Sequence, residues 1–398
     1  MIILSSCEKA IDSGDIIVKF YGDAYEDIGY SVVKADNGYV ITGQLTEISR
    51  NPGNYINGSE KKLGVIKTDS DGNIVWQKIL GDKVSASGSK VIYDDGHIIC
   101  VGYSFDSVTL QKDIYVAMMD ADGNGLVQKI FKSEGNQYGT DIIKTPAGFL
   151  ILGTTDVEQG SGESTGNAPG KKDILLLTIN DNLDQLLPPV GKGFPGNDEG
   201  IAIRQERNGG YIVVGTTDRS DNSENGQAGD NICLFRVNVD GSTTQIRIIG
   251  NAEDESAADI EVLDDGYLVA GTIGKEGFDQ RGYVWKIPSD IYDEPVSAHE
   301  ILISKAASDK PSFSLKAICR YKTNSFLMAG QYREASSSRM LIFATDIDGN
   351  MINGKILVEG GTGNQVAFDV ICDDENIIAV GKNSYENNSM ISLLKFRF

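Results

Sequence analysis

The chain has 398 residues, among them 57 Asp and Glu and 36 Lys and Arg, and its formal net charge is −21. A chain this acidic, without a long Lys/Arg run, lacks the basic face that nucleic-acid phosphates require, so we expect no nucleic-acid partner. No segment has the roughly 18–20 apolar residues of a membrane-spanning helix. The 46 Gly against 9 Pro indicate many tight turns.

The N-terminus carries a candidate targeting feature. It reads MIILSSCEKAIDSGD, and Leu4-Ser5-Ser6-Cys7 resembles the lipobox of bacterial lipoproteins, where cleavage leaves the cysteine as the lipidated first residue. A complete signal has a charged region and roughly 7–15 apolar residues before the cleavage site. Here only Met1-Ile2-Ile3 precede Leu4. A misplaced start codon, a trimmed chain and a chance match are the alternatives. We interpret residues 1–14 as a lipobox remnant and tether, with Cys7 as the lipid attachment.

A short apolar phrase built around a glycine recurs seven times. It reads GYVITG at 38–43, HIICVG at 97–102, FLILGT at 149–154, YIVVGT at 211–216, YLVAGT at 267–272, FLMAGQ at 326–331 and NIIAVG at 376–381. The anchoring glycines are Gly43, Gly102, Gly153, Gly215, Gly271, Gly330 and Gly381. Such regular repetition indicates one repetitive domain, which we place at 15–398.

Each repeat contains four short strand patterns, rich in Val, Ile, Tyr and Phe and separated by Gly/Asn/Asp clusters. In the first repeat we expect strands at 30–35, 38–43, 63–69 and 74–81. Later repeats keep this order, with first-strand residues at 140–145, third-strand residues at 113–120, 173–180 and 231–238, and fourth-strand residues at 126–132 and 244–250.

Four antiparallel strands per repeat are typical of a β-propeller blade. We therefore predict an all-β, seven-bladed β-propeller; six or eight blades would require a miscounted repeat. The seventh repeat has expected strands at 367–372, 376–381 and 390–397 and lacks a fourth. Residues 15–22, DIIVKFYG, resemble a fourth strand. We expect this N-terminal strand to complete the last blade, because closure removes two exposed sheet edges.

The repeats resemble those of bacterial β-propeller-repeat lipoproteins, a largely uncharacterised family. The residues that carry the resemblance are Asp36 to Tyr39, Gly209 to Tyr211, Asp265 to Tyr267, Asp69 to Asn73 and Trp76 to Lys78. The resemblance spans 16–398 and implies the propeller fold and a lipoprotein. It implies no reaction, because a fold does not supply a chemistry. The chain departs from the pattern in that the Trp of WQK occurs once and repeats 3, 5 and 7 lack the DxDGN turn.

The segment 69–73, DSDGN, resembles the start of a calcium loop. An EF-hand-like loop needs a bidentate Glu at position 12, and here that position is Leu80. The related segments 120–124 and 346–350 also lack the closing Glu. A hairpin turn fits better, because Asp favours the start of a type I turn and Gly accepts the positive φ that closes it. We therefore expect a turn, no metal site and no cofactor.

Candidate catalytic side chains are sparse. The two histidines, His97 and His299, form no visible pair for a metal site or a proton relay. Asp141, Asp259 and Asp369 occupy equivalent first-strand positions in repeats 3, 5 and 7, which places them around the central channel. Carboxylates meeting there are either structural or, as in glycosidases, a paired acid and base. We favour the structural interpretation and assign no catalytic residue.

The other cysteines each lie in an apolar, strand-like run without a CxxC spacing; they are Cys100, Cys233, Cys319 and Cys372. This pattern argues against a zinc site and predicts four buried free thiols. A disulfide remains open as an alternative if the chain is exported to an oxidising compartment.

Long loops are expected on one face only. In a propeller, the second-to-third-strand loops and the connectors between blades share one face, and the hairpin turns share the other. The expected long-loop face carries segments 45–61, 156–171, 189–200 and 218–229, together with the aromatic residues Tyr55, Phe105, Phe278 and Tyr385. Function tends to lie on loops held by a rigid scaffold, so we expect a partner there. Solvated insertions without a role are the alternative.

These observations predict a non-enzymatic, monomeric lipoprotein of the cell envelope, at the outer membrane or cell surface. It would bind a glycan or protein partner through the long-loop face and touch the membrane only through its lipid. The alternative function is a hydrolase or lyase acting on polysaccharide with carboxylates at the channel mouth. An architectural role in a larger surface complex is a third possibility. If 15–22 form the outer strand of the last blade, the lipid on Cys7 holds the short-turn face toward the membrane.

Overall fold

The structure, a computed structural model, describes residues 16–22, 25–50, 56–81, 84–156, 172–194, 196–218, 229–238, 242–250, 253–275, 279–292, 297–303, 312–334, 336–385 and 388–398. Within these residues the chain forms 28 strands and no helix, so none of them belongs to a helix that could span a bilayer. The predicted tether 1–14 and Cys7 lie outside the described residues.

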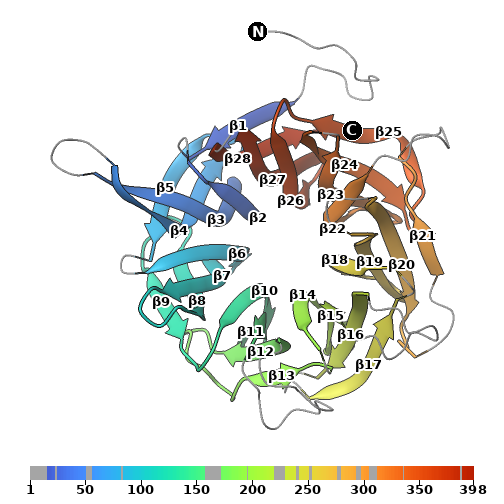
Figure 1. The fold of residues 1–398 in the computed structure, drawn as a ribbon, viewed down its shortest axis with the longest axis horizontal. Coiled ribbons are helices and arrows are strands. Elements are labelled where there is room, and N and C mark those ends of the chain that lie inside the picture. The colour runs from blue at the N-terminus through green and yellow to red at the C-terminus, as the bar shows by residue number, and fades with distance from the viewer. Residues whose placement is uncertain are drawn as a thin grey trace.

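Five four-stranded antiparallel sheets follow one another around a central axis (Figure 1). Repeat 1 forms β2 (Ile28–Ala35), β3 (Gly38–Arg50), β4 (Ile56–Asp69) and β5 (Ile74–Leu80). Repeat 2 forms β6 (Ser85–Asp94), β7 (His97–Asp106), β8 (Gln111–Asp120) and β9 (Val127–Phe131). Repeat 3 forms β10 (Gln137–Thr145), β11 (Gly148–Thr155), β12 (Asp173–Ile179) and β13 (Val190–Lys192). Repeat 4 forms β14 (Asp198–Gln205), β15 (Tyr211–Thr217), β16 (Asn231–Val237) and β17 (Thr243–Ile249). Repeat 5 forms β18 (Glu255–Val262), β19 (Gly266–Ile273), β20 (Arg281–Pro288) and β21 (Ser297–Glu300).

The last two repeats and the N-terminal strand form one eight-stranded sheet. Repeat 6 forms β22 (Phe313–Lys322), β23 (Ser325–Arg333), β24 (Ser338–Asp346) and β25 (Met351–Glu359). Repeat 7 forms β26 (Asn364–Asp373), β27 (Asn376–Tyr385) and β28 (Asn388–Phe396), and β1 (Ile17–Tyr21) adds to it. A parallel pairing of Ser338 with Asn364 joins β24 to β26. As the sequence predicts, β1 pairs antiparallel with β28, from Ile17 opposite Lys395 to Tyr21 opposite Ile391.

The hydrophobic core lies between neighbouring sheets. Ile99 of β7, for example, belongs to one cluster with Ile151 of β11 and Leu175 of β12. Ile41 of β3 packs in the same way with Leu393 of β28, which joins the first repeat to the last. Because a sheet in this ring has a neighbour on each side, its inner strands are buried on both faces. This explains why the repeated phrases are continuous apolar runs and do not alternate with polar residues.

A β-bulge lies at the same place in the first strand of every repeat. The bulged residues are Tyr30, Ser89, Thr140, Ile201, Ala258, Lys316 and Phe368. The bulge presses a first-strand carbonyl against the second strand: a Cβ on Gly43 or Gly102 would lie 1.9 Å from the carbonyl oxygen of Ile28 or Ser87. The glycine of each repeated phrase is therefore required by the close backbone approach at the bulge.

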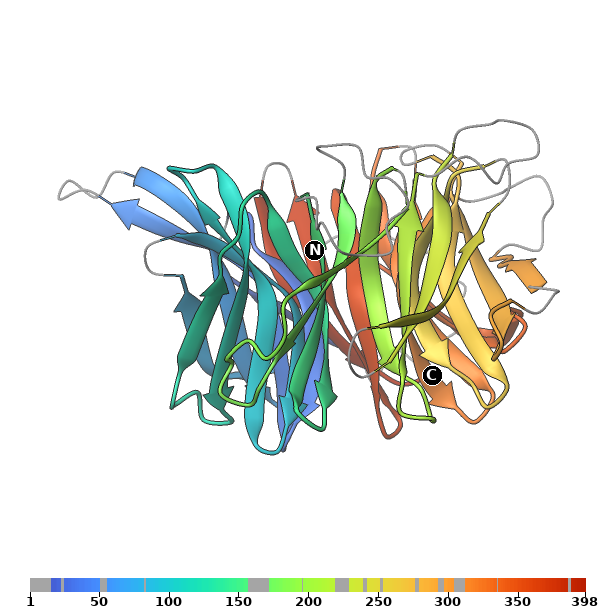
Figure 2. The ribbon, with the colours of Figure 1, turned by 90° about the horizontal axis from the view of Figure 1, so that it is seen from below.

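The DxDGN segments are hairpin turns, as predicted. In the first, the Asp69 carboxylate accepts hydrogen bonds from the backbone N–H groups of Asp71 (2.9 Å) and Asn73 (2.8 Å), and Gly72 has φ of 77°. The carboxylates of Asp120 and Asp346 accept the same two backbone hydrogen bonds in the other DxDGN turns. These turns and those between first and second strands lie along one edge of the ring (Figure 2), the hairpin face.

Repeat 3 forms the same turn although it lacks the motif. The Asn180 side chain accepts hydrogen bonds from the N–H groups of Asn182 and Asp184, at 2.9 and 2.8 Å. Leu183 takes the glycine position with φ of 62°, and its side chain is fully buried in the core between repeats 2 and 3. Burial of leucine therefore compensates for a backbone conformation that a side chain disfavours.

Two of the expected loops are partly strands. Most of 45–61 belongs to β3 and β4, which stay paired from Gln44 opposite Leu63 to Ser49 opposite Gly58 and extend beyond the ring (Figure 1). The polar composition of this stretch predicts a loop, but cross-strand pairing continues through it and keeps it extended. The expected connector 189–200 contains β13 and the start of β14. The other two expected loops are 156–171 and 218–229, and their residues 157–171 and 219–228 lie outside the described residues.

Candidate functional site

The three predicted channel aspartates meet around the central axis. Asp141, Asp259 and Asp369 line one cavity of about 110 Å³ together with Lys90 and Arg204. All three aspartates are nearly buried. Each follows a bulged residue of its first strand, so the bulge turns it toward the channel. The sequence prediction that these residues share the channel is confirmed.

Each channel aspartate bridges its own repeat to the next one. A carboxylate oxygen accepts a hydrogen bond from the backbone N–H of a neighbouring first strand: Ile203 to Asp141 at 3.0 Å, Ile318 to Asp259 at 3.3 Å, and Val32 to Asp369 at 3.0 Å. In repeat 1 the Ser31 hydroxyl takes the equivalent position and accepts a bond from Val91 N–H at 3.4 Å. The aspartates are therefore part of the contacts that hold neighbouring repeats together.

Basic residues from the even-numbered repeats balance this charge. Arg204 of repeat 4 pairs with both Asp141 (2.8 Å) and Asp259, and Lys90 of repeat 2 lies 3.4 Å from Asp369. Burial raises the pKa of Asp259, and the Arg204 and Lys90 charges oppose that rise. Each of these carboxylates therefore has backbone and cationic partners, as the structural interpretation from the sequence requires.

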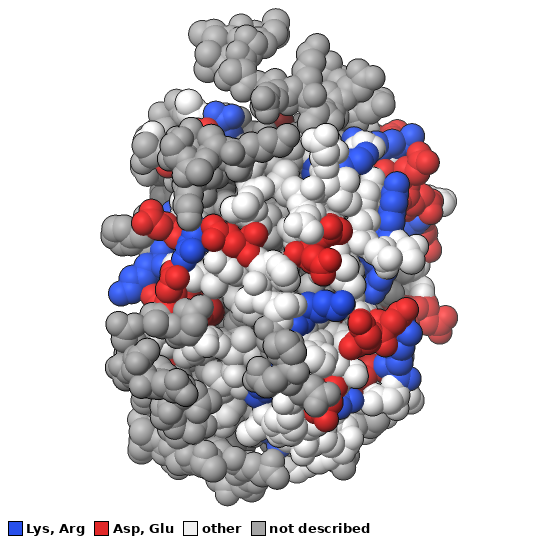
Figure 3. Space-filling model, turned by 90° about the vertical axis from the view of Figure 1, so that its right-hand side faces the viewer, with Lys and Arg blue, Asp and Glu red and all other residues white. Residues whose placement is uncertain are grey.

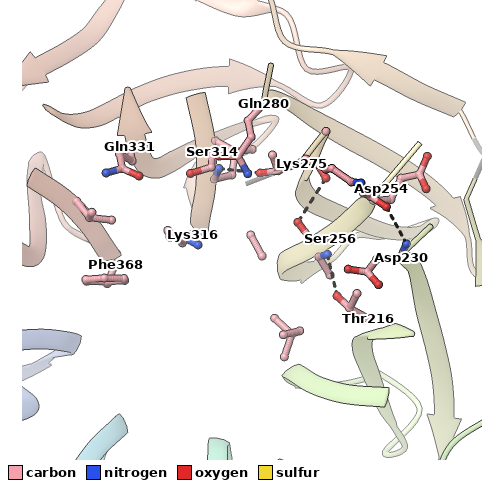
Figure 4. A pocket seen from close by; sticks show the side chains of 18 of the residues that line it. Thr216, Asp230, Asp254, Ser256, Lys275, Gln280, Ser314, Lys316, Gln331 and Phe368 are labelled. Carbon is pink, nitrogen blue, oxygen red and sulfur yellow. Dashed lines mark hydrogen bonds between the residues drawn. The ribbon is translucent and has the colours of Figure 1, made fainter. Parts of the chain in front are cut away.

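A larger cavity opens on the opposite side from the hairpin turns. It has a volume of about 900 Å³ and is lined by the first residues of β18 and β26 and the last of β15, β19 and β23 (Figure 4). Those strand ends border the second-to-third-strand loops and the connectors, so the cavity lies on the predicted long-loop face. A cleft of this size suits a ligand that is partly enclosed by the protein.

One wall of this cavity is acidic. Asp230 and Asp254 lie side by side in Figure 4, and Asp230 N–H donates to the Asp254 carboxylate at 3.3 Å. Burial raises the pKa of Asp230, and the negative charges of Asp254, Asp218 and Glu199 raise it further. This wall favours a ligand that brings hydrogen-bond donors or positive charge.

A buried acceptor also lines the cavity. Gln280 is 7 % exposed, and within the part of the chain that the structure describes its Oε1 atom has no hydrogen-bond partner. Buried amide oxygens are rarely left without a partner, because desolvation costs about 1–3 kcal/mol. A donor group of a bound ligand would satisfy this oxygen.

Aromatic side chains form the centre of the site. Phe368 and Tyr30 are bulged residues of repeats 7 and 1, and their rings contact each other with centroids 5.1 Å apart. They line a cavity of about 200 Å³ with Tyr103 and Lys316. Phe368 and Lys316 border this cavity, the 900 Å³ cavity and the channel cavity alike. A ring face beside a cation and an acidic wall is able to hold a sugar or a peptide side chain.

The other residues singled out in the sequence do not join this site. Tyr55, Phe278 and the side chain of Tyr385 lie outside the described part of the chain, and Phe105 borders none of the three cavities. The prediction of four buried free thiols holds for Cys100 and Cys233, whereas Cys319 and Cys372 are free but only partly buried. His97 and His299 lie on β7 and β21, in different repeats. Lys90, Arg204, Lys316 and Phe368 were missed. Aligning the repeats on their glycines would have found the bulged Lys316 and Phe368, because the bulge precedes each glycine at a nearly constant spacing.

On the side of the outer rim formed by β20, β21 and β25, the described residues carry charges of both signs. Acidic and basic side chains are interspersed there (Figure 3). Described ion pairs of the molecule include Lys286–Asp265 at 3.5 Å and Arg339–Glu334 at 3.1 Å. Exposed pairs of this kind contribute little stability.

No family model and no characterised protein sequence matches the chain. Solved structures do match. The fold is that of a β-propeller. An acylaminoacyl peptidase in complex with Z-Gly-Gly-Phe-chloromethyl ketone has a TM-score of 0.53 and 12% identity, over 94% of this chain and 52% of that one. The Pyrococcus horikoshii acylaminoacyl peptidase has a TM-score of 0.51 and 12% identity, over 92% and 51%.

This chain therefore spans about half the length of those two peptidases. The β-propeller domain of the Trilobed protease from Pyrococcus furiosus, with a TM-score of 0.49 and 11% identity, matches over 93% of this chain and 94% of that one. At such identities the likeness concerns the fold alone, and a shared fold carries no activity with it.

Proposed function

We propose that this protein is a non-enzymatic, monomeric scaffold of the cell envelope, anchored by a lipid on Cys7, that binds a glycan or protein partner on its long-loop face. The observation that carries the proposal is the 900 Å³ cavity on that face. Its walls combine carboxylates, lysines and an aromatic ring, which lie on paired strands or within two residues of a strand end.

The scaffold in this proposal is a seven-bladed propeller. The eight-stranded sheet divides into repeat 6 and repeat 7, which are joined through the single residue pair Ser338–Asn364. Each half keeps the order of the other repeats, since β26, β27, β28 and β1 follow one another as four antiparallel strands. The hydrophobic clusters between neighbouring repeats support the same division.

The contacts of the channel carboxylates favour binding over the hydrolase or lyase alternative. A glycosidase needs two carboxyl groups that are free to exchange protons with a sugar and a water. Asp141, Asp259 and Asp369 are instead held by backbone N–H groups of neighbouring repeats and by cations. If the alternative holds, Asp141→Asn abolishes turnover of a polysaccharide while the chain stays folded.

The first described strand after the proposed anchor begins on the opposite face from the cavity. β1 begins beside the hairpin face, where Lys19 donates to the Asn73 side chain at 2.9 Å and Lys395 donates to the Ser70 carbonyl at 2.7 Å. A lipid on Cys7 would hold that face toward the membrane and leave the cavity open to the surroundings.

Binding is tested with the full chain carrying Cys7→Ser, screened on a glycan array and in pull-downs from envelope extracts. Phe368→Ala should lower the affinity for a ligand found in this way by about tenfold or more, which corresponds to roughly 1.4 kcal/mol of binding free energy. Phe20→Ala, at an aromatic residue that is 48% exposed on β1, is the matched control and should leave binding unchanged. Equal losses in both variants, or none in Phe368→Ala, would place the ligand elsewhere.

Anchoring is tested by placing a complete signal segment before Leu4. The chain with Cys7 should fractionate with membranes, and Cys7→Ser should release it. Membrane association that persists in Cys7→Ser contradicts the anchor and leaves the binding proposal untouched.

A further inference from the structure

The acidic residues that line the 900 Å³ cavity gather at one end of it, in repeat 4 and at the start of repeat 5. Among the described lining residues they are Glu199, Asp230, Asp254 and Glu255. Glu199 pairs with Lys172, and Glu255 is fully buried. Asp230 and Asp254, which lie side by side in Figure 4, are therefore the carboxylates that a ligand reaches, and they favour a ligand cation.

The basic lining residues lie further around the ring. They are Lys275 after β19 in repeat 5, Lys316 and Arg333 in repeat 6, and Lys382 in repeat 7. Repeats 4 to 7 follow one another around the axis (Figure 1), so the acids come first and the bases last. In Figure 4, Lys316 lies on the other side of the cavity from Asp230. The cavity therefore has a negative end and a positive end.

A buried acceptor lies between the two ends. Phe313 N–H donates to the Gln280 backbone carbonyl at 2.9 Å, which places Gln280 at the junction of repeats 5 and 6. On its other side lies Gly274, whose N–H donates to the Asp254 carbonyl at 2.9 Å and on which a Cβ would lie 3.4 Å from the Gln280 Cα. The Gln280 side chain is 7% exposed, and within the described residues its Oε1 atom accepts no hydrogen bond. An N–H group of a ligand would supply the missing donor.

We propose that this cavity binds a short peptide with free ends. The N-terminal ammonium group would lie against Asp230 and Asp254. The C-terminal carboxylate would face Lys316, and an amide N–H between the two ends would donate to Gln280. A peptide carries these three groups in this order, whereas a neutral glycan carries neither charge and matches the sorted lining less well.

The inference rests on the proposed function, because both place the ligand in the same cavity, and it names a peptide as that ligand. The volume of about 900 Å³ lies within the range of small-ligand sites, so it suits a peptide of a few residues. The Phe368 ring borders the cavity beside Lys316, where it would contact an apolar side chain of the peptide.

The test uses the full chain carrying Cys7→Ser and a mixed library of tripeptides with free ends. Equilibrium dialysis with mass spectrometry identifies the retained tripeptides, and calorimetry measures their dissociation constants. Acetylation of the N-terminus and amidation of the C-terminus should each weaken binding by about tenfold or more, because each removes one of the two charges. If no free-ended tripeptide is retained, or if the blocked forms bind equally well, the proposal is overturned.

Two variants assign the ends of the peptide. Asp230→Asn should weaken binding of the free peptide, and acetylation should then cost less affinity than in the wild type. Lys316→Gln should reduce the cost of amidation in the same way. Asp71→Asn, at a side chain that is 69% exposed on the hairpin face, is the matched control and should bind like the wild type. An unchanged cost of acetylation in Asp230→Asn contradicts the position of the ammonium group. The blocked peptides are also measured on the wild type, so a variant that fails to fold does not affect the main result.

Failure of this inference is separable from failure of the proposed function. A partner from the glycan array or the pull-downs that loses affinity in Phe368→Ala, while no tripeptide is retained, would overturn the peptide and leave the proposed function standing. The absence of any ligand in all of these screens would overturn both.

Discussion

At the scale of single residues, the repeated glycines show how sequence and backbone geometry depend on each other. Each lies where the bulge of a first strand brings a carbonyl oxygen against the second strand, with no room for a side chain. The same bulge turns Tyr30, Lys316 and Phe368 toward the channel mouth. One local irregularity therefore explains both the repeated phrase and the residues that line the site.

Gly102→Ala should lower the free energy of unfolding by about 1–3 kcal/mol, because its Cβ would lie 1.9 Å from the Ser87 carbonyl oxygen and a backbone must move to accept it. Gly361→Ala is the control, since a Cβ there meets nothing within 4 Å. Urea unfolding of the two variants measures both values. Equal stabilities would show that the backbone at the bulge shifts to accept the Cβ at little cost in free energy.

A buried carboxyl group should make stability depend on pH. Asp198 is fully buried, and burial, opposed by its hydrogen bonds and reinforced by the Asp173 charge, raises its pKa from 3.8 to about 7. Between these pH values the folded chain binds more protons here than the unfolded chain. Stability is therefore lost as the pH rises, by up to roughly 1.4 kcal/mol per pH unit from this group. Asp198→Asn should flatten this slope in urea unfolding between pH 4 and 7, and an unchanged slope would contradict the argument.

At the scale of elements, the hairpin turns show the limits of motif reading. The DxDGN turns were predictable because Asp, Asn and Gly each have a local role. The turn at 180–184 escaped prediction, because Leu183 replaces glycine and is stabilised by burial between two repeats. The paired extension of β3 and β4 escaped for the converse reason: its polar residues resemble a loop, yet cross-strand pairing keeps it extended.

Leu183→Gly should destabilise the chain. Loss of a fully buried leucine costs about 2–5 kcal/mol, which exceeds the 1–2 kcal/mol or so of left-handed strain that glycine relieves. Leu110→Gly is the matched comparison, because Leu110 has φ of 59° but is 68% exposed, so relief of strain should dominate. Thermal unfolding of both variants measures whether each substitution lowers or raises the stability of the folded chain. Destabilisation of similar size in both would show that burial is not the deciding difference.

At the scale of the whole molecule, closure of the ring joins the two ends of the sequence. β1 pairs with β28, Tyr21 donates its hydroxyl hydrogen to the Gly72 carbonyl at 2.8 Å, and the cluster of Ile41, Val380 and Leu393 fills the space between repeats 1 and 7. Without β1, β28 would present a full row of unpaired backbone groups.

Deletion of residues 1–22 should therefore lower the unfolding midpoint and cause self-association through β28. Size-exclusion chromatography with light scattering measures the association, and deletion of residues 1–15 is the control, because it leaves β1 intact. A monomeric chain of unchanged stability after the longer deletion would mean that β1 is dispensable for closure.

The sequence by itself determined the repeat, the strand order, the N-terminal strand that pairs with the last repeat, the hairpin turns and the shared position of Asp141, Asp259 and Asp369. These features follow from local rules, since strand periodicity and turn chemistry act within a few residues and recur in every repeat. Only the tertiary structure decided the contacts between repeats. The pairing of Arg204 with two aspartates and the cavity beside Phe368 join residues far apart in the chain. Their meeting depends on how bulged strands converge around an axis, which no single repeat encodes.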